Sequence, residues 1–121
     1  MRPLLSKELP LFLKRFGNFV DAEIRSFEMP SPTTIKVIIA CQDEARGFDW
    51  LTLHLEFSSI LDAKLIDNSK LSYIDLSEGM NIIYENDIFH FCVGNYTTAS
   101  GIKNAVSYIM SSNIKYEEKP F

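Results

Sequence analysis

The sequence has few of the residues that build disulfide-stapled domains or phosphate-binding loops. Its two cysteines, Cys41 and Cys92, do not form a CxxC pair, so we expect free buried thiols in a reducing compartment. Its five glycines form no glycine-rich phosphate loop, and neither Ser-Ser pair, at 58–59 and 111–112, stands in a G-x-S-x-G context. The chain therefore carries no signature of a P-loop enzyme or of a serine hydrolase.

Long apolar runs and clustered basic residues are also missing. The longest purely apolar run, VIIAC at 37–41, is too short to span a bilayer. Lys7, Glu8 and Pro10 interrupt the N-terminal leucines, so we expect no secretory signal and a cytoplasmic protein. The twelve basic residues are scattered and the formal net charge is −4, which disfavours nucleic acid and membrane as partners. A basic protein is the more natural partner.

The 121 residues, 46% of them hydrophobic, predict a single domain over 1–121. From residue 20 onward apolar and polar side chains alternate, as in half-buried antiparallel strands. In the first predicted strand, the side chains that point inward are those of Val20, Ala22, Ile24 and Ser26. MPSPTT at 29–34 predicts a turn, because its prolines cannot pair in a ladder. In the second strand, TIKVIIAC at 34–41, one face carries Ile35, Val37, Ile39 and Cys41, and Lys36 lies on the other.

The alternation is cleanest in DWLTLHLEF at 49–57, which follows a polar loop at 42–48. Its core face carries Leu51, Leu53, Leu55 and Phe57, and its other face carries Trp50, Thr52, His54 and Glu56. Beyond it we expect a short strand at 61–66 and a turn or single helical turn around 70–76. MNIIYENDIFHFCVG at 80–94 predicts a hairpin across residues 85–87, with the inward side chains Phe89, Phe91 and Val93.

The two ends of the sequence complete the expected fold. Ser6 is a candidate N-cap, and Pro10 limits the N-terminal helix to one or two turns. Residues 100–113 are compatible with helix or strand, and we favour a bulged final strand from about 105 to 117. The predicted fold class is α+β, mainly β: a bent antiparallel sheet of about six or seven strands with a short N-terminal helix.

FVDAEIRSFEM at 19–29 places Asp21 and Glu23 two positions apart, a spacing that on one strand face suits a metal site or an acid/base pair. Such a pair needs a third ligand or an environment that splits the two pKa values, whereas Arg25 two positions further offers charge balance. We therefore interpret the stretch as the solvated face of a strand.

His54 and His90 are the only histidines, and Cys92 follows His90 by two positions. Two histidines and a cysteine on neighbouring strands would suit zinc or copper, and Lys36 would allow a His-His-Lys ribonuclease arrangement. The HxC spacing alone is not diagnostic. We expect ordinary histidines on the outer sheet face, with no metal and no cofactor.

Trp50, flanked by Phe48 and the acidic loop DEARGFD at 43–49, is the most suggestive surface feature. Aromatic anchors surrounded by charges are common at protein interfaces. The alternative is that Trp50 covers a second core under a helix.

Three segments together carry a resemblance to a known group of proteins: FVDAEI at 19–24, WLTLHLEFSSILDAKL at 50–65 and YIMSSNIKYEEKPF at 108–121. In this order the chain after residue 17 resembles small immunity proteins of bacterial polymorphic toxin and contact-dependent inhibition systems. The resemblance implies a small α+β or mainly β domain that is not an enzyme and that neutralises a cognate toxin by binding it. It transfers no catalytic residue.

Many such toxins are nucleases with basic active sites, so the resemblance implies a partner-binding surface rich in acidic side chains. Our candidates are Asp43, Glu44, Asp49, Trp50, Glu85 and Asp87. Two other classes stay open: a small metal- or ligand-dependent enzyme that uses His54, His90 and Cys92, and a structural homo-oligomer. A homodimer paired through an exposed sheet edge stays open as well.

Overall fold

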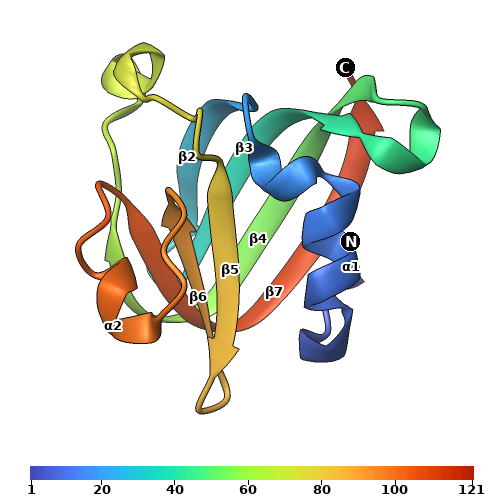
Figure 1. Ribbon diagram of the computed structural model, residues 1–121. Coiled ribbons are helices and arrows are strands. Elements are labelled where there is room, and N and C mark those ends of the chain that lie inside the picture. The colour runs from blue at the N-terminus through green and yellow to red at the C-terminus, as the bar shows by residue number, and fades with distance from the viewer.

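Seven antiparallel strands form one strongly bent sheet in the order β2-β3-β4-β7-β6-β5, with β1 paired to a separate part of β7 (Figure 1). This computed structural model describes residues 1–121. The strands are β1 (Arg2–Pro3), β2 (Glu23–Ser31), β3 (Thr34–Asp43), β4 (Asp49–Lys64), β5 (Met80–Glu85), β6 (Ile88–Val93) and β7 (Tyr108–Pro120). The helices are α1 (Leu9–Arg15) and α2 (Ala99–Ile102), and the short 3-10 turns are η1 (Ser6–Glu8), η2 (Gly17–Phe19), η3 (Glu44–Arg46) and η4 (Asn68–Tyr73). The predicted fold class is confirmed.

Strands β3 and β4, whose sequences alternate most regularly, pair with each other inside the sheet. The two strands pair without a break from Thr34 opposite Ser58 to Asp43 opposite Asp49. All eight side chains predicted to point inward from these strands are buried: Ile35, Val37, Ile39, Cys41, Leu51, Leu53, Leu55 and Phe57. A period of two therefore located this part of the core correctly.

Strands β4 and β7 pair with each other along their length, and both bend near the point where the pairing of β3 with β4 ends and that of β6 with β7 begins. Ser59 has a left-handed backbone (φ 56°), and β4 continues through it to Lys64, so the separate strand predicted at 61–66 is wrong. In β7, Ser112 and Asn113 are both exposed between buried Ser111 and Ile114, which breaks the alternation. On one side of the bend β4 pairs with β3, and on the other β7 pairs with β6. The bend lets one sheet wrap around its own core.

The start of β2 differs from the prediction. The strand begins at Glu23, while Val20 is 49% exposed and Asp21 has a left-handed backbone (φ 60°), so neither lies on a strand face. A register shift between Ile24 and Ser26 turns Phe27 inward instead of Ser26. Bulges of this kind reverse the faces of a strand, and sequence alternation does not reveal them.

The turn after β2 is shorter than predicted. β2 extends through Pro30 to Ser31, which pairs with Thr34, so only residues 32–33 connect the two strands. Pro30 is tolerated there because β2 is an edge strand. Midway along this edge, the Asn68 side chain accepts a hydrogen bond from the Phe27 N–H (2.9 Å) and donates one to the Phe27 carbonyl (3.1 Å). Asn68 thereby occupies backbone groups that another strand would need.

Helix α1 has about two turns, as predicted, with Pro10 in its first turn, where a missing N–H costs nothing. Ser6 does not cap it, because Ser6 is the first residue of η1; the Glu8 carboxylate instead accepts a hydrogen bond from the Leu5 N–H (2.9 Å). The inward side of α1 packs on the concave face of the sheet, where the Phe12 ring lies 5.1 Å from the Tyr116 ring, centroid to centroid.

The remaining elements lie close to their expected positions. The predicted hairpin is present as β5 and β6, with left-handed backbones at Asn86 and Asp87. The helical turn expected at 70–76 occupies 68–73 as η4. The ambiguous segment divides into the single turn α2 and a final strand that runs from 108 to 120 instead of 105 to 117. No helix has the length and apolar character needed to cross a membrane.

Candidate functional site

An exposed aromatic patch lies at the end of the sheet where β4 begins and β7 ends. We define the aromatic patch as Phe48, Trp50 and Phe121, which are 60%, 39% and 68% exposed. The ring centroids of Trp50 and Phe121 are 5.6 Å apart, and the Gln42 side chain, opposite Trp50 in β3, donates a hydrogen bond to the Phe48 carbonyl (3.2 Å). The alternative in which a helix covers Trp50 is wrong. Exposed aromatic side chains that gather at one end of a sheet, two of them with their rings in contact, are typical of contact surfaces.

Exposed charges border this patch. The Arg25 guanidinium carbon lies 5.5 Å from the centroid of the Phe121 ring, and Arg25 pairs with Glu23 (Nη2 to Oε2, 3.2 Å). The charge balance predicted for Glu23 is thus confirmed. Lys119 and Glu117 form a second, looser pair (3.9 Å). Exposed pairs contribute little to stability, so these side chains are free to exchange partners on binding.

The predicted partner-binding residues do not form one surface. Glu44 and Asp49 are exposed at the end of the sheet that carries the aromatic patch. Glu85 and Asp87 are exposed at the tip of the β5–β6 hairpin, at the opposite end (Figure 1). Asp43 is fully buried, so its carboxylate does not lie on the surface as the prediction required.

Asp43 is instead the centre of an ion-pair network. Arg15 of α1 donates two hydrogen bonds to the Asp43 carboxylate (2.8 and 2.7 Å) and also pairs with Glu118 of β7 (2.6 Å). Arg46 contacts both carboxylates, at 3.4 and 3.1 Å. The hydrogen bonds from Arg15 hold the pKa of Asp43 below its usual value, and the Ala45 N–H and the nearby charges lower it further against the effect of burial. The network therefore ties α1 to β3 and β7.

A sequence signal for this network existed. Asp43 continues the inward series of β3 by one more step of two, directly after Cys41. The run of polar residues at 42–46 hides this signal, because charged residues are seldom fully buried. Arg15, twenty-eight residues away in sequence, gave no sign of being its partner.

The two thiols are free and buried, as predicted. Burial, together with the negative charge of Asp43, raises the pKa of Cys41 to about 12, and burial raises the pKa of Cys92 as well. The thiolate is the reactive form, so we expect neither thiol to react with Ellman's reagent at pH 8 until the protein unfolds. Release of two equivalents of thionitrobenzoate in denaturant, and of none before, would confirm this. Rapid reaction of the native protein would contradict it.

His54, His90 and Cys92 do not converge. His54 lies opposite Glu117 of β7 and His90 lies opposite Met110, so the two histidines are seven positions apart along β7, or about 23 Å. No group of three or more His, Cys, Asp or Glu side chains is placed to hold a metal ion. The trio required by the alternative, a metal- or ligand-dependent enzyme, is therefore not assembled.

Each of these side chains has its own surroundings. Burial lowers the pKa of His54, and the charges of Lys36 and Lys119 add to this. The predicted outer-face position of His90 and Cys92 is correct, but both are buried. Cys92 forms a small second core with Ile102 of α2 and Ala105. Lys36 lies near His54 only, so the ribonuclease arrangement is not formed either.

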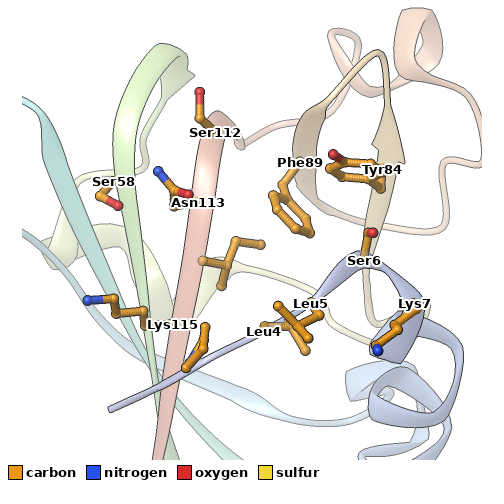
Figure 2. Close-up of a pocket in the computed structure, with 12 residues that line it drawn as sticks. Leu4, Leu5, Ser6, Lys7, Ser58, Tyr84, Phe89, Ser112, Asn113 and Lys115 are labelled. Atoms are coloured by element: carbon orange, nitrogen blue, oxygen red, sulfur yellow. The ribbon is translucent and has the colours of Figure 1, made fainter.

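A pocket of about 530 Å³ opens at the edge of β7, between the N-terminal segment and the β5–β6 hairpin (Figure 2). We call it the edge pocket. Its lining residues are Pro3, Leu4, Leu5, Ser6, Lys7, Ser58, Tyr84, Phe89, Ser112, Asn113, Ile114 and Lys115. Sequence reasoning did not single out this site, because its residues come from four separate segments that meet only where β7 changes partners.

Comparisons with protein families, with curated proteins and with solved structures each find no match for this chain.

Proposed function

We propose that this chain is a protein-binding domain, and that it acts as an immunity protein that occludes a cognate bacterial toxin domain. The observation that carries the proposal is the aromatic patch. Trp50 is the residue type most typical of binding hot spots, and its ring is held against Phe121 while remaining 39% exposed. A side chain that is already ordered loses little conformational entropy when a partner covers it.

The charge distribution supports a basic partner. Residues 61–90 contain six acidic and two basic side chains, so this quarter of the chain carries the full formal charge of −4. The segment includes η4 and the tip of the β5–β6 hairpin with Glu85 and Asp87. Because η4 and the hairpin tip lie at opposite ends of the molecule (Figure 1), these carboxylates do not form one surface. The net negative charge as a whole would accelerate encounter with a basic protein, while the aromatic patch provides short-range contact.

The test uses the C-terminal domain of a secreted protein encoded directly upstream of this chain's gene, if one is present. Co-expression of the wild-type chain is expected to rescue cells from that domain. Trp50→Ala is expected to weaken binding about thirtyfold, because truncation of a hot-spot residue costs about 2 kcal/mol. The measurement is isothermal titration calorimetry with the purified domain.

Leu61→Ala provides a control, since Leu61 is an apolar residue 57% exposed in β4, eleven positions from Trp50 and beyond the bend at Ser59. We expect it to leave the affinity within about twofold of wild type. A toxin domain that still kills cells producing the wild-type chain would overturn the proposal. So would a wild-type dimer that Trp50→Ala converts to a monomer, because the patch would then be a self-association surface.

A further inference from the structure

The edge pocket exists because β7 lacks a neighbouring strand over a short stretch. β6 pairs with β7 up to Phe89 opposite Ser111, and β1 pairs with it from Lys115 onward. Between them, Leu4 donates a backbone hydrogen bond to the Ile114 carbonyl (2.9 Å). Residues 112–113 therefore lie at a gap in this edge of the sheet, and both are exposed.

Apolar side chains form the two walls of the gap. On one side, the rings of Tyr84 and Phe89 are 4.7 Å apart, and Tyr84 is 40% exposed. The Tyr84 hydroxyl donates a hydrogen bond to Asp87 (3.2 Å), which fixes the ring's orientation. On the other side lie Leu4 and Leu5, with Leu5 46% exposed (Figure 2). The pocket therefore offers an ordered aromatic wall facing an aliphatic one.

The charged residues that line this pocket are both basic, Lys7 and Lys115, on opposite sides of it (Figure 2). Two carboxylates lie at its margin: Asp87 accepts the hydrogen bond from Tyr84, and Glu8 accepts one from the Leu5 N–H (2.9 Å). Neither lysine takes part in any ion pair, although Glu56 lies opposite Lys115 in the sheet. Ser112 and Asn113 add neutral hydrogen-bonding groups.

We propose that the edge pocket binds a small organic anion, with a carboxylate or phosphate attached to a flat apolar body. Its volume of about 530 Å³ lies within the usual range for small-molecule sites, about 300 to 1,000 Å³. The flat body packs against the Tyr84 and Phe89 rings, and the anionic group pairs with a lysine at either end. The edge pocket is separate from the aromatic patch. Ser58, which lines the pocket, and Trp50 both belong to β4 and are eight residues apart, which corresponds to about 26 Å along the strand.

The test is a titration of ¹⁵N-labelled protein with three probes that share one ring system: 2-naphthoate, 2-naphthyl phosphate and the neutral 2-naphthamide. We expect saturable shifts of the backbone amides of Ser112, Asn113 and Lys115 with at least one anion. We expect that anion to bind about fivefold more tightly than the amide, as one exposed charge pair allows. Preference for naphthoate or for naphthyl phosphate identifies the carboxylate or phosphate class.

Variants separate the charged and apolar contributions. The double variant Lys7→Gln, Lys115→Gln is expected to remove the preference for the anion without changing amide binding, while Lys103→Gln, an exposed lysine outside the pocket, leaves both unchanged. Tyr84→Leu is expected to weaken all three probes. Equal affinity for amide and anions, shifts centred on the aromatic patch, or no saturable shift would each overturn the proposal. Failure of this proposal is distinguishable from failure of toxin binding, which is measured with a different ligand and with substitution of Trp50, a residue that does not line the edge pocket.

Discussion

Replacing Asp43 by asparagine is expected to lower the free energy of unfolding by about 3 kcal/mol at pH 7, because removing one partner of a buried ion pair leaves the other uncompensated. Asp43 is fully buried, and the Arg15 side chain, which donates two hydrogen bonds to it, is 26% exposed. The variant keeps a side chain of the same size but loses the charge that Arg15 and Arg46 face. Arg15 would retain only Glu118, and α1 would lose its firmest attachment to β3.

The effect is expected to depend on pH in a defined direction. The pKa of Asp43 is lower in the folded chain than its ordinary value of 3.8, with the hydrogen bonds from Arg15 as the main cause. A group with a depressed folded pKa stabilises the protein fully above its unfolded pKa and loses this contribution as the pH falls through the folded value. The difference between wild type and Asp43→Asn should therefore be constant from pH 7 to about 5 and shrink below about pH 4.

Urea unfolding at pH 7 and at pH 3 measures both quantities. Asp49→Asn is the matched control, because Asp49 lies directly opposite Asp43 in the ladder but is exposed. We expect it to change stability by less than about 0.5 kcal/mol. Equal effects of the two substitutions, or a pH-independent difference for Asp43→Asn, would show that the carboxylate does not stabilise the fold as we describe.

Gly79→Ala is expected to destabilise the protein by about 3 kcal/mol or more. Gly79 has a left-handed backbone (φ 72°), which costs other L-residues about 1 to 2 kcal/mol. An added Cβ would also clash with the carbonyl oxygen of Asn18, a backbone atom that moves only with η2. Gly79 in addition accepts a hydrogen bond from the Gly94 N–H (2.8 Å), so a shift of the turn would disturb the start of β5.

Gly47→Ala separates the two contributions. Gly47 has nearly the same backbone angle (φ 64°), but no atom lies within 4 Å of the position that a Cβ would take. It should therefore show the backbone strain alone, about 1 kcal/mol. The measurement is the urea midpoint of both variants. Similar losses for the two would mean that η2 yields easily and that its contact with Gly79 is not a constraint on the fold.

Predictions from sequence were most accurate where neighbouring strands are regular. In β3, β4 and the β5–β6 hairpin, each residue's face follows from a period of two and from local turn signals, so the inward side chains were assigned correctly. They were least accurate where a strand bulges or a proline sits on an edge, as at Arg25 and Pro30 in β2. Edge pairing depends on which strands lie nearby, and local composition does not contain that information.

In the candidate sites, too, the exposure of a residue could be predicted from sequence, whereas its contacts with distant residues could not. Trp50 could be assigned to an exposed face from alternation alone, since its neighbours Leu51 and Leu53 require the opposite face. Its contact with Phe121, seventy-one residues later, depends on the pairing of β4 with β7. The separation of His54 from His90 depends on strand order, because β7 lies between their strands.

The sequence by itself determined that the chain is a mainly β protein with an acidic surface, since periodicity and charge are properties of short stretches and of composition. Only the tertiary structure decided that Asp43 is a buried partner of Arg15, that the Trp50 and Phe121 rings meet, and that a pocket opens at the edge of β7. Each of these joins residues far apart in the chain. Such contacts are set by the order, register and bends of the strands, which are chosen by packing of the whole sheet.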